Sequence, residues 1–506
     1  MEKNNINWDL IVIGGGVTGA GILREAERNG IKTLLLEQKD FAWGTSSRSS
    51  KMVHGGIRYM KEGMFGLTYE SVKERQKLLK EAPFLIKTLG FLMPIYKDKS
   101  PSKLSMSIGL AIYDLMGLKW GHKFIKKEKM NKVFENLNSE KLKGVFYFED
   151  AKTDDARLVI RLIMEAVQGD SKALNYHRVN SVKKTENGFS VTAFDEGNKS
   201  EIVFKGKNVI NATGVWSDKI SRLPFNNKHI RPLRGSHIVF PRKFIPIDDA
   251  IGFSHPHDGR MLFIVPWQNT IICGTTDVDH SNDLNNEPSI TKEEFDYLLE
   301  CVNHYFPTVK LTDNDIISTY AGVRPVVSSG NLSPSQESRE FILWKEDGIT
   351  SVTGGKLTTF RKIAMDTLKK AGFKLKLKNQ PVFNKLENTK NIYNIENSIW
   401  EKLLGRYGND AHKVVKDKAP PLLDSIPGTD YLWAELPYTV EKEKIHHLSD
   451  LLLRRVRVGN ILQEGGLVHL DMIESLCSEY LPWDSDRWRN EKDQYIKFWR
   501  KYYSIP

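Results

Sequence analysis

Near the start of the chain the hydrophobic positions fall into two short runs. Residues 9–13 and 33–37 are almost continuously apolar, a pattern that predicts buried strands. Between them lie a glycine-rich turn and a helical stretch that ends near Asn29, with Gly30 as the expected helix stop. Strand, turn, helix and strand in this order predict the first βαβ unit of a nucleotide-binding fold.

Later apolar runs predict further strands, and therefore a mixed sheet content. These runs lie at residues 207–211, 238–240, 261–265 and 270–273. Residues 291–306 instead carry apolar side chains at helical spacing, and Thr291 with Glu294 forms a capping-box pattern at their start. We expect this helix to serve packing.

The last part of the chain changes character. Residues 374–394 are rich in Lys and Asn and contain few large apolar residues, so we expect a linker there. Residues 445–458 and 485–503 have the periodicity of amphipathic helices, with Trp488 and Trp499 on one side of the second. A helical domain is therefore expected after the linker.

Composition narrows the class of protein. The length of 506 residues favours two or three domains, and the net charge of +11 favours anionic partners such as a phosphorylated substrate, an anionic lipid or a nucleic acid. Cys273, Cys301 and Cys477 lie far apart, so we expect neither a disulfide framework nor a metal site, in a reducing, cytoplasmic compartment. Residues 1–8 lack the features of an export signal, and no run approaches the roughly 18–20 apolar residues of a spanning helix.

Three glycines with separate tasks occupy the turn after the first strand. Gly14 allows a tight turn, Gly16 lets the backbone approach a pyrophosphate, and Gly19 allows close packing of helix on strand. The helix start supplies N–H groups and a positive dipole end to the phosphates. Glu37 ends the second strand, where its carboxylate can accept hydrogen bonds from a ribose diol. The motif predicts a dinucleotide and does not separate FAD from NAD.

Three further blocks carry a resemblance to a known family. They are residues 44–59 (GTSSRSSKMVHGGIRY), 211–218 (NATGVWSD) and 353–361 (TGGKLTTFR). With the glycine turn, they resemble the FAD-dependent glycerol-3-phosphate dehydrogenases, within the wider group of amino-acid-oxidase-like flavoproteins. The resemblance extends more loosely to the C-terminal region through residues 435–438 (ELPY) and 451–455 (LLLRR).

The resemblance implies an α/β fold with three parts. These are a Rossmann-like FAD-binding domain, a mixed-sheet substrate domain and a C-terminal helical cap. The expected boundaries are residues 1–75, 150–225 and 340–373 for the first, 76–149 and 226–339 for the second, 374–394 for the linker and 395–506 for the cap.

The implied cofactor is FAD, bound noncovalently. Ala212 and Gly355 each follow a predicted strand, and two strand-to-helix turns that meet one cofactor suit FAD better than NAD. The helix start after Gly355 can stabilise negative charge on a reduced flavin ring. The residues expected to hold the cofactor are Gly14, Gly16, Gly19, Glu37, Thr45, Ser46, Ser47, Ala212, Thr213, Gly214, Gly355, Lys356, Leu357 and Thr358.

A phosphorylated alcohol needs cations for its phosphate and a group that takes the hydroxyl proton. Arginine suits the first task because its fork binds phosphate through two hydrogen bonds, and the resemblance places Arg58, Arg324 and Arg339 in the substrate pocket. His237 matches a family active-site position and could accept the proton near neutral pH. A structural core histidine is the open alternative for His237.

The implied reaction is hydride transfer from C2 of sn-glycerol 3-phosphate to the flavin, which gives dihydroxyacetone phosphate. Tyr59 could bond the substrate, and Lys356 could hold a substrate oxygen or polarise the flavin. An FAD-dependent amine or amino-acid oxidase of the same fold is an alternative, because its substrate carboxylate could also pair with arginine. A flavin-bearing nucleic-acid-binding protein is a third, but the chain lacks an aromatic-interleaved basic patch, so we expect no nucleic acid.

The resemblance implies a membrane quinone as the electron acceptor, with oxygen as the acceptor in a related oxidase group. Residues 104–120 are apolar and lie among lysines, as an element on an anionic membrane surface would, while ordinary core packing is equally open. We therefore expect peripheral attachment to the cytoplasmic face of the inner membrane. A homodimer is a further expectation.

Overall fold

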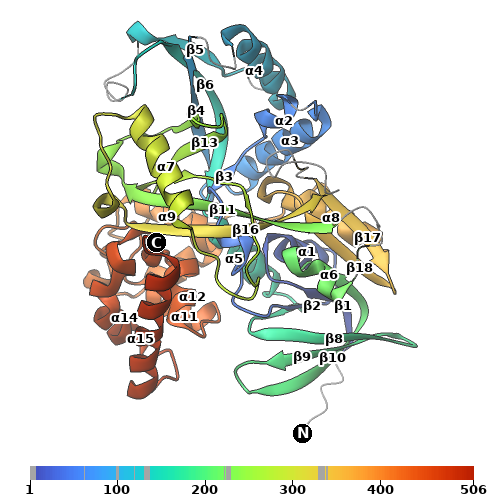
Figure 1. The fold of residues 1–506 in the computed structure, drawn as a ribbon. Helices are drawn as coiled ribbons and strands as arrows, with labels where there is room; N and C mark the ends of the chain where they lie inside the picture. The colour runs from blue at the N-terminus through green and yellow to red at the C-terminus, as the bar shows by residue number, and fades with distance from the viewer. Residues whose placement is uncertain are drawn as a thin grey trace.

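Two β-sheets and a helical C-terminal region make up the computed structural model of this chain (Figure 1). Sheet A lies low in that view, sheet B rises above it, and the C-terminal helices gather at the lower left. At positions 7, 58, 61 and 229 the structure describes the backbone alone. The described residues are 7–61, 63–97, 102–118, 120–129, 137–221, 223, 229–328, 337 and 340–506.

Sheet A combines parallel and antiparallel strands. In spatial order it contains β17 (Phe341–Glu346), β18 (Ile349–Gly354), β10 (Ser200–Asn211), β1 (Asn7–Ile13), β2 (Thr33–Leu36) and β7 (Lys172–Leu174), while β9 (Gly188–Asp195) pairs with β10 and β8 (His177–Thr185) pairs with β9. The strands from β18 to β7 are mutually parallel, and β9 and β17 run antiparallel to their neighbours. The predicted βαβ unit is confirmed as β1, α1 (Val17–Arg28) and β2.

Both faces of sheet A are covered, which explains why its strands read as continuous apolar runs. Leu10 and Val12 of β1 pack against α1, α5 (Asp155–Ala166) and α8 (Phe360–Lys370). Ile11 and Ile13 point to the opposite face, where they pack with Val191 of β9. Alternate residues of one strand thus enter two separate cores.

Sheet B is built mainly from antiparallel pairs. It contains β15 (Val278–Asp279), β11 (His229–Pro241), β14 (Thr270–Gly274), β13 (Met261–Trp267), β12 (Ala250–Ser254), β4 (Ile86–Tyr96), β6 (Leu142–Thr153) and β3 (Met52–Val53), with β16 (Ser318–Ser328) beside β11 and β5 (Lys123–Lys126) beside β6. All four strands predicted between residues 207 and 273 are confirmed, as parts of β10, β11, β13 and β14. The two sheets and the helical region confirm the predicted α/β class.

Helices cover two sides of sheet B. The predicted packing helix is confirmed as α7 (Lys292–Tyr305), which begins with the Thr291 and Glu294 capping box and buries Phe295 and Leu298 in the sheet B core. Near the other edge lie α2 (Ile57–Lys61), α3 (Phe65–Glu81) and α4 (Lys103–Gly117), which pack against β4 and β6. In the described part of the chain, no helix is both long enough and apolar enough to cross a bilayer.

The C-terminal region is helical, as predicted, but one expected helix is interrupted. In place of one helix over residues 445–458, the structure has α12 (Leu448–Asp450), a π-helix (Leu451–Arg455) and α13 (Val458–Ile461). The left-handed backbone of Arg457, with φ of 55°, separates the π-helix from α13. The second expected helix is confirmed as α15 (Ser485–Tyr502). The remaining helices here are α9 (Asn397–Tyr407), α10 (Ala411–Val415), α11 (Glu435–Lys442) and α14 (Leu470–Cys477).

The segment expected to be a linker, residues 374–394, contains no helix or strand. Two of its side chains are nevertheless buried, because Val382 and Phe383 pack into the core between α1, α5 and α8. Glu81 accepts a hydrogen bond from the Val382 amide, and Glu165 accepts one from Asn384. The segment is therefore packed along the surface of sheet A's helices.

Candidate functional site

A cavity of about 2030 Å³ is lined by residues of both sheets. Ligand pockets usually measure about 300–1,000 Å³, so this volume leaves room for a dinucleotide together with a small substrate. Its walls include Ile13 and Val352 from sheet A and Phe91 and Phe263 from sheet B. The parallel strands β1, β10 and β18 end at this cavity, the place where α/β sheets bind ligands.

The glycine turn forms the nucleotide end of the cavity. Gly14 and Gly16 line it, whereas Gly19 lies behind the turn and does not. Gly14 has φ of 111°, and a Cβ on it would lie 2.5 Å from the carbonyl oxygen of Ala212. A Cβ on Gly19 would overlap the carbonyl oxygen of Gly14. Only glycine therefore allows the helix α1 to start this close to the strand ends.

Glu37 is held at the same end by backbone amides. Its carboxylate accepts hydrogen bonds from Gly15 N at 2.6 Å and from Lys39 N at 2.9 Å, and it lines the cavity. Burial raises the pKa of Glu37 despite these bonds. The first turn of α1 contains no acidic side chain, so its dipole remains positive toward the cavity. This combination suits a ribose beside a pyrophosphate.

The loop of residues 44–50 closes over the turn. Ser46 accepts a hydrogen bond from Val17 N at 2.9 Å, and Thr45 donates one to the carbonyl of Val323 on β16. Ser46 and Thr45 both line the cavity. Ser47 does not: it is buried, and its carbonyl accepts hydrogen bonds from Lys51 at 2.8 Å and from Arg457 at 3.0 Å.

Two strand-to-helix turns meet in the middle of the cavity. The residues that line it there are Ala212, Thr213, Gly214, Gly355, Lys356, Leu357 and Thr358. Thr353 donates a hydrogen bond to the Gly214 carbonyl at 2.8 Å, which fixes one turn against the other. Thr358 donates to the His54 carbonyl at 3.0 Å. These turns offer close backbone approach on one side of a flat ring system.

Cationic side chains gather at the other end of the cavity. Arg324 donates to Asp277 at 3.1 Å and to Thr275 Oγ1 at 3.1 Å. The guanidinium of Arg260 lies 3.7 Å from the second carboxylate oxygen of Asp277, so one acid orients two arginines. All four residues line the cavity. Such a pair can bind a phosphate through several hydrogen bonds.

Lys356 and Tyr59 face each other across the same region. The Lys356 ammonium lies 3.6 Å from the centroid of the Tyr59 ring and donates to Ser71 Oγ at 3.2 Å, and both Tyr59 and Lys356 line the cavity. Arg58 lies in α2, where only its backbone is described. Arg339 lies outside the described residues. Their predicted roles therefore remain predictions.

His237 occupies a buried position on β11. Its side chain is 1% exposed, it stacks on Tyr320 with ring centroids 4.5 Å apart, and it does not line the cavity. Its Nε2 atom lies 2.8 Å from Ser50 Oγ, and Ser50 does line the cavity. Burial, followed by the charges of Arg324 and Lys51, lowers the pKa of His237 well below its usual value, so the imidazole is neutral at neutral pH.

Several cavity residues were not predicted from the sequence. They are Ser50, His255, Arg260, Thr275 and Asp277. Arg260 precedes an apolar run, and Thr275 and Asp277 directly follow another, so polar residues at predicted strand ends were the available signal. The proximity of Arg260 and Arg324 could not be inferred, because Arg260 lies just before β13 and Arg324 lies on β16, two strands that the sequence does not place together.

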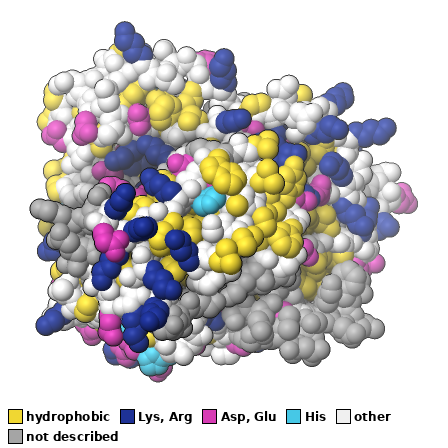
Figure 2. Space-filling model, turned by 90° about the horizontal axis from the view of Figure 1, so that it is seen from above, with side chains coloured by type: hydrophobic (Ala, Val, Ile, Leu, Met, Phe, Trp, Pro, Cys, Tyr) yellow, Lys and Arg dark blue, Asp and Glu magenta, His cyan; other side chains and the backbone are white. Residues whose placement is uncertain are grey.

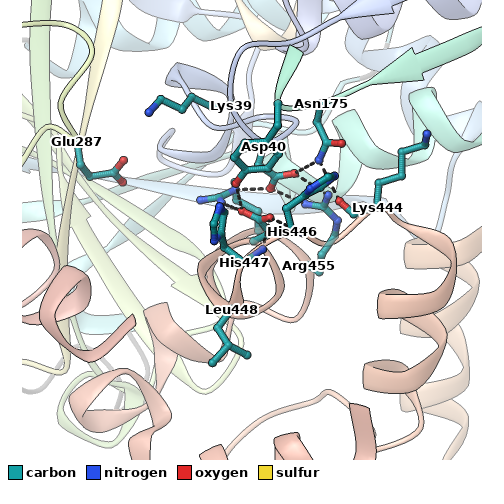
Figure 3. A network of polar contacts seen from close by, with 12 residues as sticks. Lys39, Asp40, Asn175, Glu287, Lys444, His446, His447, Leu448 and Arg455 are labelled. Carbon is teal, nitrogen blue, oxygen red and sulfur yellow. Dashed lines mark hydrogen bonds and ion pairs between the residues drawn. The ribbon is translucent and has the colours of Figure 1, made fainter. Parts of the chain in front are cut away.

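A buried ionic network ties the nucleotide end to the C-terminal helices (Figure 3). Asp40, just after β2, accepts hydrogen bonds from Arg454 at 2.5 Å and from Arg455 at 2.9 Å. These two arginines hold the pKa of Asp40 down to about 2 against the effect of burial. Asn175 joins Asp40 to the carbonyl of Lys444. The π-helix is thereby fixed to the base of the nucleotide site.

Comparison with known proteins follows the same division of the chain. A family model described as FAD dependent oxidoreductase matches residues 9–361, and one described as the C-terminal domain of alpha-glycerophosphate oxidase matches residues 371–488. The aerobic glycerol-3-phosphate dehydrogenase of Staphylococcus epidermidis is 34% identical to this chain over an aligned length of 500 residues. The alignment covers 90% of this chain and 88% of the relative. The aerobic glycerol-3-phosphate dehydrogenase of Staphylococcus aureus is 31% identical, with 98% and 96% covered.

Solved structures agree. The glycerol-3-phosphate dehydrogenase from Bacillus halodurans complexed with FAD has a TM-score of 0.76 and 26% identity to this chain, over 100% of this chain and 96% of that one. The L-alpha-glycerophosphate oxidase from Mycoplasma pneumoniae with FAD bound shares the fold, with a TM-score of 0.59 and 19% identity over 76% and 99%. The chain therefore belongs to the FAD-dependent oxidoreductases and, within them, to the glycerol-3-phosphate dehydrogenase family.

Proposed function

We propose that this protein oxidises the C2 alcohol of sn-glycerol 3-phosphate to dihydroxyacetone phosphate, with FAD as its cofactor. The observation that carries the proposal is that one cavity joins the glycine turn at Gly14 to the arginine pair Arg260 and Arg324. The names of the relatives support the same substrate. FAD bound in this cavity supplies the two-electron acceptor for the hydride.

The residues have separate tasks in this reaction. The turn at Gly14 and Gly16 and the start of α1 hold the pyrophosphate, and Glu37 binds the ribose. Arg324, fixed by Asp277 and Thr275, binds the substrate phosphate, with Arg58 and Arg339 as further proposed phosphate ligands. Lys356 and Tyr59 orient the glycerol oxygens.

His237 is the proposed proton acceptor, because the imidazole is neutral and can take a proton. Burial, followed by the charges of Arg324 and Lys51, lowers the pKa of His237 and weakens it as a base, and a phosphate dianion at Arg324 offsets the Arg324 part of this effect. Binding of the substrate therefore prepares the base for the reaction.

Anaerobic bleaching of the purified yellow protein tests the proposal. sn-Glycerol 3-phosphate should abolish the flavin absorbance band, while glycerol at the same concentration leaves it, because glycerol lacks the phosphate that Arg324 binds. A panel of amino acids tests the oxidase alternative. Bleaching by an amino acid, and not by the phosphorylated alcohol, would refute the proposal.

The electron acceptor is the second part of the proposal, and the exposed face of α4 supports a membrane quinone. Five large apolar side chains on α4 or just after its end are between 55% and 91% exposed: Leu104, Ile108, Leu115, Leu118 and Trp120. Met106, Leu110 and Tyr113 are buried, so core packing accounts for one face of α4 and leaves the other open. Ile108 and Ile112 also line the cavity, so the apolar face continues inward. Seen from above, hydrophobic side chains gather beside Lys and Arg side chains (Figure 2).

We propose that this face rests on an anionic membrane, on the cytoplasmic side of the inner membrane, and admits the quinone. Flotation with anionic liposomes should carry the protein upward, and Leu118→Asp should leave it at the bottom. Val468→Asp is the matched control, because Val468 is 85% exposed on the C-terminal helical region. Reoxidation of the reduced protein by a soluble quinone should outpace reoxidation by oxygen; the reverse would favour the oxidase alternative.

The domain boundaries and the homodimer are also proposals. We propose that residues 1–75, 150–225 and 340–373 form the FAD-binding domain, and that residues 76–149 and 226–339 form the substrate domain. Sheet A draws its strands from the first set. Sheet B takes β4, β5, β11–β16 and most of β6 from the second set, while β3 and the end of β6 lie in the first. Sedimentation analysis of the holoprotein tests the dimer directly.

A further inference from the structure

Ser50 stands between the cavity and the imidazole of His237. Its residue lines the cavity and is partly exposed, while His237 is 1% exposed and does not reach the cavity surface. Ser50 Oγ and His237 Nε2 lie 2.8 Å apart. Among the described residues, Nδ1 of His237 has no hydrogen-bond partner. Ser50 is thus the polar contact that connects this imidazole to a bound substrate.

Two neighbours pack against the His237 ring within the described part of the chain. Tyr320 of β16 stacks on one ring face with 15° between the planes, and the Gly274 backbone of β14 packs against the ring edge. The charged groups that act on the imidazole are Arg324 and Lys51. Because His237 does not line the cavity and Ser50 does, the Ser50 hydroxyl offers a path for a proton from the cavity to Nε2.

Ser50 is held in place by its neighbours in the chain. Ser49 donates to Asp155 through its amide at 2.8 Å and its hydroxyl at 2.7 Å, and its carbonyl accepts from Tyr320 at 2.9 Å. On the other side, Lys51 is fully buried and pairs with Asp155 at 2.7 Å. Residues anchored on both sides fix the Ser50 hydroxyl with little freedom to lose on substrate binding.

We propose that Ser50 is a catalytic residue that takes the proton of the substrate hydroxyl while it passes its own proton to His237. The inference rests on the proposed function. The C2–H bond breaks and its electron pair leaves as hydride to the FAD, the second C2–O bond forms, and the O–H bond breaks. The hydroxyl proton moves to Ser50 Oγ, and the Ser50 proton moves to His237 Nε2. Ser50 is unchanged at the end, and His237 is protonated.

Single-turnover flavin bleaching in mixtures of H2O and D2O tests the relay in the unmodified protein. Two protons that move together give a curved dependence of the rate on the deuterium fraction, and a straight line would overturn the relay. Absence of any bleaching by sn-glycerol 3-phosphate would instead refute the proposed function, so the two failures are distinguishable.

Variants provide a second test. Ser50→Ala should lower the bleaching rate about 100-fold, at the lower end of general-base contributions, with FAD content unchanged. Ser50→Thr retains the hydroxyl and should restore most of the rate. Ser105→Ala is the matched control, because Ser105 lines the cavity on α4 and its hydroxyl contacts Ser102. A Ser50→Ala rate equal to that of the unmodified protein would contradict the relay.

The tautomer of His237 gives a readout that does not depend on turnover. The relay requires Nε2 to accept from Ser50, so the proton of the neutral ring lies on Nδ1. Nitrogen NMR of labelled, oxidised holoprotein should show this tautomer, with the signal assigned by its loss in His237→Gln. A neutral ring protonated at Nε2 would overturn the proposal.

Discussion

The two ends of the cavity are built in different ways. At the nucleotide end the backbone does most of the binding, and the residues involved lie close together in the sequence, as in the turn from Gly14 to Gly19. At the substrate end the groups are side chains from separate strands and loops, including Ser50, Arg260 and Arg324. Each is oriented by a partner elsewhere, such as Asp277.

This difference predicts how each end responds to change. A backbone site depends on close approach, so one added methyl group can abolish it. A side-chain site depends on charges and hydrogen bonds, so removal of one member weakens binding while the fold persists. Substitutions at both ends, and one beyond them, test this contrast.

Gly19→Ala should have the largest effect. The new Cβ would overlap the Gly14 carbonyl oxygen, which belongs to the backbone and cannot rotate away. We expect the purified variant to contain no FAD, as measured by its absorbance spectrum. Gly121→Ala is the control, because nothing lies within 4 Å of a Cβ there. A Gly19→Ala protein with full flavin content would show that FAD binding does not depend on this close approach of helix and strand.

Asp40→Asn should have the next largest effect, on stability. Arg454 and Arg455 would lose the buried carboxylate that they share and keep only Asp450 and Glu443, respectively; breaking a buried ion pair costs about 3–5 kcal/mol. The pKa of Asp40 is lowered to about 2, so its ionised form stabilises the fold above its ordinary pKa near 3.8, and this stabilisation is lost as the pH falls toward 2. Urea unfolding of the holoprotein at several pH values measures both the loss of stability and its pH dependence.

The pH dependence separates this role from general damage. In the unmodified protein, the free energy of unfolding should decrease between about pH 4 and pH 2, in part through Asp40. Asp40→Asn should lose that part of the slope and be less stable at pH 7. Equal stability of both proteins at pH 7 would show that the network does not hold the nucleotide end.

Arg324→Ala should affect the substrate end alone. Loss of a charge-assisted phosphate contact costs about 2–3 kcal/mol, which corresponds to a KM increase of roughly 30- to 150-fold. FAD content should stay unchanged, because Arg324 contacts Asp277 and Thr275 and no part of the glycine turn. Arg242→Ala is the control, since Arg242 pairs with Asp248 at the surface. An unchanged KM would show that the phosphate binds elsewhere.

The same contrast explains what could be predicted from the sequence. The βαβ unit, the capping box at Thr291 and the turns at Ala212 and Gly355 were predictable because their residues are local and their requirement is steric. The sequence of β1 shows no alternation of apolar and polar residues, because both faces of the strand are buried. Its continuous apolar run still indicated a strand. Local sequence patterns therefore predicted most of the fold and most of the nucleotide end of the cavity.

Long-range packing set the limits of that prediction. The sequence indicated His237 as a base, but not that Tyr320 and Gly274 would bury it behind Ser50. It indicated one helix over residues 445–458, but the pairing of Arg454 and Arg455 with Asp40, more than 400 residues earlier, accompanies a π-helix there. Such contacts have no signature in a single sequence.

Thr291→Ala should have the smallest effect. This variant tests whether the helix α7 belongs to the substrate site or only to the scaffold around it. Loss of the cap on α7 costs about 1 kcal/mol, measurable by urea unfolding, and Thr291→Ser should restore it. Glu294, the other half of the capping box, accepts hydrogen bonds from Ser236 at 2.9 Å and Thr276 at 2.6 Å, next to His237 and Thr275. These bonds do not involve Thr291.

The cap and the site therefore share Glu294 but use different atoms of it. In the cap, Thr291 Oγ1 accepts from the Glu294 amide and the Thr291 amide donates to Glu294 Oε2, whereas Ser236 and Thr276 donate to Glu294 Oε1. If the substrate end depends on side-chain orientation rather than on helix stability, KM should be unchanged in Thr291→Ala and raised in Glu294→Ala. A raised KM in Thr291→Ala would mean that the stability of α7 itself positions the arginine pair, and the boundary between scaffold and site would have to move to include that helix.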